Sequence, residues 1–263
     1  MFTPKKFQID PETPLLYHFV SRCVRHSSLS GLDPDTGEDL SHRKLWLIER
    51  LNFLVQCFAV DLYGFRIMNN HFHLALFHDP KAHLRWTDDE VADRWLALSP
   101  PRVSGRKQLT PAFLAEHRKA LLADRERLTH VRTELGSVST FMKFLKQGIA
   151  RRANHEQGTM GHFFEQGLWA SAVLTDRALA FTHQYIDLNP VHAIIAKWID
   201  EIRTNGIAAR LAHIEADPKS LERYLKPAPF EPVPAWAVVP VSLRSYIEQM
   251  EIISDAHYPD GPP

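Results

Sequence analysis

The segment MNNHFHLAL contains two histidines, His71 and His73, separated by a single residue. Because alternate residues of a β-strand project from the same face, both imidazoles would share one face, and Phe72 and Leu74 the other. Two imidazoles placed in this way can bind one divalent cation when a further ligand comes from elsewhere in the chain. Taken alone, such a pair is more often two surface or hydrogen-bonded histidines. His78 is out of phase with the pair, and we expect it in a loop.

A second candidate site is the segment HQYIDLNPVHA, which contains Tyr185 and Asn189. On a helix, residues four positions apart lie on one face, about one turn from each other. A tyrosine can act as a covalent nucleophile, but its hydroxyl needs activation at neutral pH, which a metal that polarises the electrophile supplies. Taken alone, Tyr185 is an ordinary helix tyrosine, and Asn189 before Pro190 equally fits the N-cap of a new helix.

The surrounding sequence predicts the elements that position these residues. Runs rich in β-branched and aromatic residues predict strands, and apolar residues at helical spacing predict helices. Asn69 and Asn70 separate two short apolar runs and favour a tight hairpin. The predicted order is β-α-β-β-α-β, with strands at 15–23, 60–68, 72–77 and 168–174 and helices at 43–60 and 138–154. We therefore expect an α+β fold with a ferredoxin-like split βαβ core, a central antiparallel sheet and an appended helix that carries Tyr185.

The pattern also predicts the organisation of the chain. Residues 1–14 form an N-terminal tail and 15–200 one domain, in which 80–136 is a helical insertion with few apolar residues. Residues 201–263 form a C-terminal extension that holds eight of the 18 prolines from Lys226 onward, with a short helix near 242–253.

Composition excludes several classes of protein. The chain has 263 residues, of which 44% are hydrophobic and 24% charged, so it is neither disordered nor fibrous. Two cysteines exclude a disulfide scaffold, and no apolar run has the length of a membrane span, so we expect a cytoplasmic protein without a membrane partner. Gly-rich nucleotide loops, Ser-His-Asp motifs and Cys-rich zinc motifs are absent from the sequence. The net charge is zero, but residues 117–152 contain nine Lys/Arg against three acids.

The His-Phe-His and Tyr-Ile-x-x-Asn-Pro motifs together resemble those of single-tyrosine transposases of bacterial insertion sequences, a family named for its histidine-hydrophobic-histidine motif. The resemblance is to the branch of REP-associated tyrosine transposases and their larger relatives. It covers roughly residues 15–200 and includes, in the family's order, the segments YHFVSRCVRHSSL, HRKLWLIERL, AVDLYGFRIMNNHFHLAL, WTDDEVADRWLAL and YIDLNPVHA.

The resemblance implies an enzyme that cleaves and transfers single-stranded DNA. It implies that His71 and His73 bind Mg²⁺ or Mn²⁺ and that Tyr185 attacks the scissile phosphate, giving a 5′-phosphotyrosine and a free 3′-OH. Asn189 stands where related enzymes complete the metal shell. The implied partner is a hairpin or palindromic repeat in single-stranded DNA, bound by a monomer or a homodimer.

Phosphodiester transfer requires cations that neutralise the DNA backbone. We expect these cations on the second predicted helix and at the end of the first strand: Lys143, Lys146, Arg151, Arg152, Arg22 and Arg25. The family usually carries a basic, aromatic run just before the tyrosine helix. Here that run is EQGLWASAVL, with no cation from 163 to 175, and His192 stands where an Arg is common.

Two other functions remain open at this stage. One is a catalytically idle protein that binds DNA hairpins, and the position of Tyr185 relative to the histidines discriminates it. The other is a metal-dependent hydrolase in which the histidines act with an acid such as Asp187 or Glu165. The hydrolase predicts zinc, and cleavage that survives Tyr185→Phe.

Overall fold

The computed structural model describes residues 9–24, 27–101 and 109–174, together with short stretches and single positions further on. These further positions are 178, 182, 185–186, 224–225, 239–242, 244–246 and 248. Arg25, Asp187, Asn189 and His192 lie outside the described residues, as does most of the chain predicted to be helical after Leu174.

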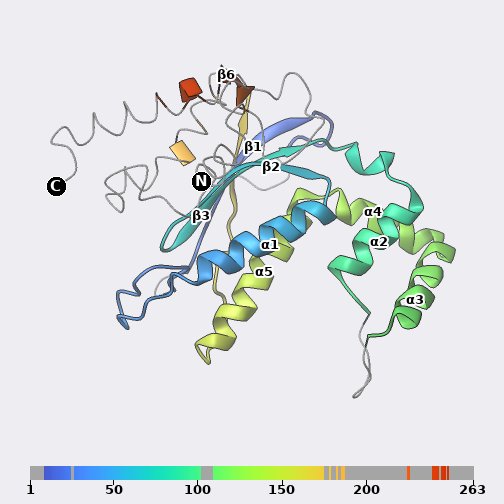
Figure 1. The fold of residues 1–263 in the computed structure, drawn as a ribbon, viewed down its shortest axis with the longest axis horizontal. Coiled ribbons are helices and arrows are strands. Elements are labelled where there is room, and N and C mark those ends of the chain that lie inside the picture. Colours follow the sequence, from blue (N-terminus) through green and yellow to red (C-terminus); the bar gives the residue numbers. More distant parts are fainter. Residues whose placement is uncertain are drawn as a thin grey trace.

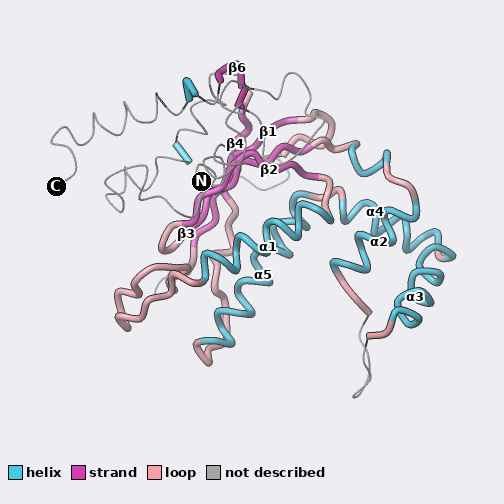
Figure 2. The backbone as a smooth tube through the Cα atoms, in the orientation of Figure 1, coloured by secondary structure: helices cyan, strands magenta, loops and turns pink. Residues whose placement is uncertain are grey.

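A four-stranded antiparallel sheet forms the centre of the fold (Figures 1 and 2). Its order is β2-β3-β1-β4, with β1 at Leu15–Arg22, β2 at Val60–Ile67, β3 at His71–His78 and β4 at Trp169–Val173. The expected α+β class with an antiparallel sheet is confirmed, and β2 and β3 are joined by a turn at Asn69 and Asn70 as predicted. The strand that carries both histidines is an interior strand of this sheet.

Two helices cover one face of the sheet. They are α1, Arg43–Cys57, and α5, Val138–Glu156, which lie beside each other on the same side in Figure 1. Alternate strand residues point toward them: Tyr17 and Phe19 of β1 and Phe72 and Leu74 of β3 are all fully buried. The residues between these positions, including the histidines, therefore face the other side of the sheet.

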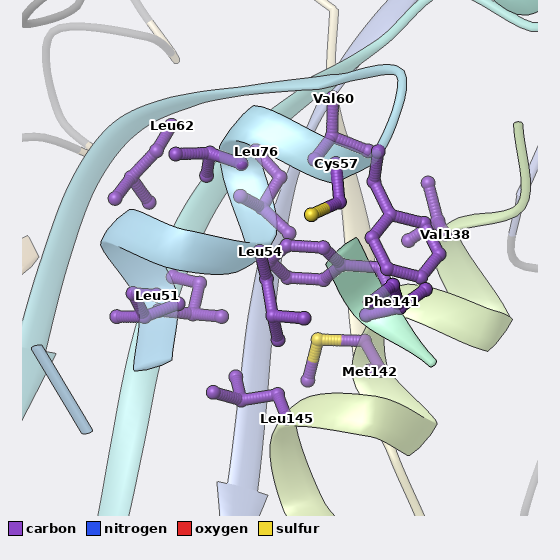
Figure 3. Packing of buried hydrophobic residues seen from close by; sticks show 14 of the residues in the cluster. Leu51, Leu54, Cys57, Val60, Leu62, Leu76, Val138, Phe141, Met142 and Leu145 are labelled. Atoms are coloured by element: carbon purple, nitrogen blue, oxygen red, sulfur yellow. The ribbon is translucent and has the colours of Figure 1, made fainter. Parts of the chain in front are cut away.

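The apolar core lies between the sheet and these helices (Figure 3). Leu51 and Leu54 of α1 meet Phe141 and Leu145 of α5, and Leu76 contributes from β3; all five side chains are 1% exposed or less. Burial of such side chains stabilises the fold by roughly 1.5–3 kcal/mol each. This core holds β1 and β3 in register and so fixes where the residues of the opposite face lie.

The helical insertion packs onto the same core. It comprises a short 3₁₀ helix at Ala82–Arg85, α2 at Asp88–Leu98, α3 at Pro111–Ala123 and α4 at Arg125–Leu135. Thr87 and Glu90 form a reciprocal capping box that starts α2. The buried residues Val91, Leu121, Leu128 and Leu135 belong to one cluster with the residues of α1 and α5. The insertion therefore shares the core of the domain.

Three arginines of α3 and α4 form ion pairs with three aspartates of α2. Arg118 contacts Asp89 at 2.6 Å and Asp93 at 2.5 Å, and Asp88 contacts Arg125 at 2.5 Å and Arg132 at 2.6 Å. These aspartates lie 25 to 44 residues before their partners. A third of the nine cations counted between 117 and 152 therefore neutralises acids within the insertion.

The expectation that His78 lies in a loop is wrong. His78 is the last residue of β3, it is buried, and its Nε2 lies 2.9 Å from the carbonyl oxygen of Gly136. Because His78 is an odd number of residues from His73, it lies on the opposite face of β3, which packs toward α4, so it cannot join the other two histidines.

A second, two-stranded sheet lies beyond the sequence predicted for the main domain. It pairs β5, Tyr224–Leu225, with β6, Val239–Ser242, and residues 244–246 are helical. The sequence predicted a helix in this region and neither strand. Among the helices that the structure describes, none has the length and apolar character of a membrane span.

Candidate active site

The register between β1 and β3 determines which residues of β1 lie beside the histidines. Arg22 lies opposite His71, and Val20 lies opposite His73. On the other side of β3, Arg66 of β2 lies opposite His73. Residues that are distant in sequence thus meet on the face of the sheet that α1 and α5 leave uncovered.

His73 is the most buried residue of this group, with 3% of its surface exposed. Its Nδ1 lies 3.0 Å from Nε2 of His18, on the neighbouring strand. Burial, with smaller contributions from His71 and His18, lowers the pKa of His73 to about 3, and burial lowers that of His18 to about 4. Both rings are therefore neutral at pH 7. Nε2 of His73 is buried and has no hydrogen-bond partner among the residues that the structure describes.

His71 lies nearer the surface. Its ring centroid is 4.9 Å from that of His73, and its Nδ1 lies 2.7 Å from Oδ1 of Asn70. Since an amide oxygen can only accept, Nδ1 of His71 is the donor and its Nε2 keeps a lone pair. Burial and then the positive charge of Arg22 lower the pKa of His71.

Tyr185 lies on the same side of the sheet as the histidines. Ala178, Thr182, Tyr185 and Ile186 are helical, and the Thr182 hydroxyl donates a 2.7 Å hydrogen bond to the carbonyl oxygen of Ala178. Ile186 is fully buried, whereas Tyr185 is 48% exposed. The Tyr185 ring centroid is 5.6 Å from that of His73 and 5.8 Å from that of His18. The Tyr185 ring thus lies against the rings of His18 and His73. An orientation toward the histidines is what the strand-transfer enzyme requires and the idle DNA-binding protein does not.

The cavity at this site has a volume of about 630 Å³. Pockets that bind small ligands usually have volumes of roughly 300–1,000 Å³. It is lined by β1, β3, the start of β4, the segment before it and the tyrosine helix: His18, Val20, Arg22, His71, His73, Glu165, Gly167, Trp169, Thr182 and Tyr185. Trp169 is half exposed, and its ring meets that of His18 edge-on, with centroids 5.3 Å apart. The cavity therefore combines imidazoles, a guanidinium, a hydroxyl and an exposed aromatic ring.

The cations expected to contact DNA are distributed over three places. Arg22 lines the histidine cavity. Lys143, Lys146 and Arg151 line a separate hollow of about 430 Å³ between α5 and residues 161–168. Arg152 lies on the other side of α5, with its guanidinium carbon 3.9 Å from the centroid of the Trp46 ring. Arg25 is outside the described residues.

Glu165 lines both the hollow beside α5 and the histidine cavity. The backbone N–H of Glu165 donates to the carbonyl oxygen of Arg22 at 2.9 Å, and its own carbonyl oxygen accepts from Nζ of Lys146 at 2.8 Å. The Lys146 ammonium also lies 5.5 Å from the centroid of the Phe164 ring. Lys146 thus holds the segment that forms the wall between the two hollows.

Within the described part of the chain, no group of three or more His, Cys, Asp or Glu side chains is arranged to hold a metal ion. Glu165, the acid considered for a hydrolase, lines the cavity without completing such a group. Sequence reasoning overlooked His18 and Trp169. The available signal for His18 was alternation, because His18, Val20 and Arg22 occupy one face of the first predicted strand.

Comparisons with known proteins complete this description. No family model and no curated protein matches the chain. Among solved structures, the fold is similar to that of a REP-associated tyrosine transposase bound to a REP hairpin. The TM-score is 0.46 and the sequence identity 11%, with 81% of this chain and 86% of that chain covered.

Proposed function

We propose that this protein is a metal-dependent enzyme that cleaves single-stranded DNA and transfers the strand through a 5′-phosphotyrosine on Tyr185. The observation that carries the proposal is the position of Tyr185, 5.6 Å from His73 between ring centroids, within the cavity that also contains His71 and Arg22. A nucleophile, two neutral imidazoles and a cation converge there from three separate segments: the tyrosine helix, β3 and β1. The order of the main sheet agrees with a ferredoxin-like split βαβ core, which would bring the last helix to this face.

The two histidines fit a divalent cation by the chemistry of their rings. His73 is neutral because its pKa is about 3, so a cation would not have to displace a proton from it. Its buried Nε2 lacks a partner in the described part of the structure, and Nε2 of His71 keeps a lone pair. Mg²⁺ and Mn²⁺ prefer oxygen, so the remaining ligands in this proposal are phosphate oxygens and the amide of Asn189. Such a cation would polarise the phosphate and stabilise the charge that develops on it.

The side chains of the cavity account for the proposed transfer. The Tyr185 oxygen forms a bond to phosphorus while the bond from phosphorus to the 3′ oxygen breaks. The hydroxyl proton passes to solvent, to which Tyr185 is exposed, and the 3′ oxygen takes up a proton as it leaves. Because the phosphotyrosine linkage is itself a phosphodiester, it retains the energy of the broken bond, and a 3′-OH can reverse the reaction without ATP. Arg22 would hold a non-bridging phosphate oxygen through a charged hydrogen bond.

The surface around the cavity supplies groups suited to a DNA strand. The hollow beside α5 presents Lys143 and Arg151, which would neutralise phosphates outside the reacting one. Trp169 lines the cavity and is half exposed, and base-aromatic stacking contributes roughly 1–3 kcal/mol per base. A single strand that enters along α5 would thus reach Tyr185 past Glu165.

The test is a denaturing gel of the purified protein with end-labelled single-stranded hairpins taken from repeats that flank its gene. Reactions contain Mg²⁺, Mn²⁺ or EDTA, with Tyr185→Phe and His71→Ala in parallel. We expect a covalent protein-DNA band that requires metal, Tyr185 and His71. Tyr63→Phe is the matched control, because Tyr63 is a buried tyrosine of β2, a strand that does not line the cavity.

Two other outcomes would identify the other functions. Cleavage that needs the histidines but survives Tyr185→Phe, without a covalent band, would indicate a hydrolase in which Glu165 or Asp187 contributes. Hairpin binding with neither cleavage nor adduct would indicate a catalytically idle binder. The absence of cations from 163 to 175 would then be the leading explanation for the missing cleavage.

A further inference from the structure

We infer that His18 is a positioning residue for His73: its Nε2 accepts a hydrogen bond from Nδ1–H of His73 and thereby fixes the tautomer in which His73 Nε2 carries a lone pair. The inference deepens the proposed function and rests on it for the identity of the ligand, a divalent cation. The pairing of the two rings is itself a feature of the folded chain.

The geometry of the two rings is that of a hydrogen bond in the ring plane. Nε2 of His18 and Nδ1 of His73 are 3.0 Å apart, the planes are within 20° of each other, and the centroids are 5.2 Å apart. In a face-to-face stack, one ring would lie above the other. Here the two nitrogens lie between the two ring centroids, so the rings meet edge to edge. Coplanar rings joined at two nitrogens form an N–H···N bond, in which one ring donates and the other accepts.

Burial decides which ring donates. Two N–H groups cannot point at each other across 3.0 Å, so the contact contains one proton, carried by one of the two nitrogens. If His18 were the donor, His73 would accept at Nδ1, and the N–H hydrogen of the His73 ring would then be on Nε2. That atom is buried and has no acceptor among the described residues, and buried N–H groups without an acceptor are rare. With His73 as the donor, Nε2 keeps a lone pair that a cation can use.

The neighbouring histidine has the same arrangement. Nδ1–H of His71 donates to Oδ1 of Asn70, which leaves Nε2 of His71 as its ligand atom. Each of the two rings thus has its own acceptor at Nδ1, Asn70 for His71 and His18 for His73. In metal sites, a partner at the second ring nitrogen fixes the orientation of the ligating imidazole and raises its basicity.

His18 itself does not become a ligand beside His73. Its Nε2 is directed at Nδ1 of His73, and a cation at Nε2 of His73 lies on the other side of that ring. His18 therefore acts through His73 and touches neither cation nor phosphate.

The tautomer can be read directly in the metal-free protein. In ¹⁵N-labelled protein at pH 7.5, long-range ¹H–¹⁵N correlation distinguishes a protonated Nδ1 from a protonated Nε2. The His73 signals are assigned by their loss in His73→Gln. We expect His73 to be protonated at Nδ1 in the wild type and to lose this preference in His18→Leu. A wild-type His73 protonated at Nε2 would overturn the inference.

Mn²⁺ titration of the folded protein provides the second readout. We expect His18→Leu, which removes the acceptor, to weaken Mn²⁺ binding roughly 10–100-fold. His18→Gln keeps a carbonyl acceptor and should restore most of the affinity. His78→Gln is the matched control, because His78 is a buried histidine at the other end of β3 that contacts Gly136 instead. Wild-type affinity in a folded His18→Leu would contradict the inference.

The two readouts separate this inference from the proposed function. A wild-type protein that neither binds Mn²⁺ nor forms an adduct would overturn the proposed function. Protonation at Nδ1 of His73 that depends on His18 would still support the inference in that case. Metal binding and adduct formation that are both indifferent to His18→Leu would reject the inference and leave the proposed function intact.

Discussion

Arg22 of β1 lies directly opposite His71 of β3 in the antiparallel pairing. A guanidinium is always charged, so the imidazole beside it resists protonation, and Arg22 is one of the two causes that lower the pKa of His71. The same pairing places a cation next to the ring that is proposed to bind metal. Burial and then the charge of Arg22 favour the neutral form of His71. In the proposed function, Arg22 would also contact the phosphate of a bound strand.

Arg22→Gln should therefore weaken binding of single-stranded DNA roughly tenfold, which corresponds to the loss of one charged hydrogen bond. The slope of log K against log salt should fall by about 0.7, the value for one phosphate contact on a single strand. Fluorescence anisotropy at several salt concentrations measures both quantities. Arg125→Gln is the control, because Arg125 pairs with Asp88 in the insertion. An equal effect of the two substitutions would show that Arg22 has no special contact.

Trp169→Ala should weaken binding of a single strand by about 1–3 kcal/mol, because it removes an exposed ring on which a base can stack. Trp169→Phe keeps a smaller ring and should lose less. Leu174→Ala serves as the control, since Leu174 follows the same strand and is 70% exposed without lining the cavity. The anisotropy titration used for Arg22 would reveal the difference, and wild-type affinity in Trp169→Ala would reject stacking.

The metal-free protein should lose stability as the pH falls from about 6.5 to about 4. In the unfolded chain His18 takes up a proton near pH 6.5, whereas in the folded chain its pKa is about 4. The unfolded state therefore binds more protons within this window, so the free energy of unfolding decreases as the pH falls. His18 contributes roughly 3 kcal/mol to this loss.

Urea unfolding in EDTA at pH 7.5, 5.5 and 4.5 measures this dependence. His18→Gln should have a lower stability at pH 7.5 but a shallower decline toward pH 4.5, because one titrating group is gone. Identical slopes for the wild type and His18→Gln would show that His18 is not held neutral by the fold.

Arg43→Ala should destabilise the domain by about 1–3 kcal/mol, because it breaks a part-buried ion pair and leaves the buried carbonyl oxygen of Ser28 without its donor. Arg43 at the start of α1 is fully buried, its Nε donates to Glu156 of α5 at 2.7 Å, and its Nη1 donates to the carbonyl oxygen of Ser28 at 2.8 Å. Urea unfolding measures the change. Lys44→Ala, at the next position, is the control, and equal stabilities of the two variants would contradict the buried role of Arg43.

Much of the fold follows from local sequence. The pattern around His71 and His73 predicted a strand with both imidazoles on one face, and the two asparagines predicted the turn before it. The position of Tyr185 on that face was expected from a resemblance to a known family. For the strand and the turn, the necessary information lies within a few residues, because strand alternation and turn preferences are local properties.

The contribution of His18 depends on a relationship that no local pattern contains. Its contact with His73 requires the register of β1 against β3, which the packing of Tyr17 and Phe19 against the helices determines. The ion pairs of Arg118 are similar, because a count of basic residues cannot show that aspartates 25 and more residues away neutralise them. Charge distribution is a property of the fold, whereas charge count is a property of the sequence.

The two faces of β1 carry different kinds of residues, and this limits which insertions and deletions in the gene the fold can tolerate. A one-residue shift in this strand would exchange Tyr17 and Phe19 with His18 and Arg22, placing charge in the core and aromatic rings in the cavity. Single-codon deletions within 15–22 should therefore abolish folding and the site together. The exposed loop residues 34–38 do not alternate between two faces, so inherited differences in length should accumulate there and be absent from the strand.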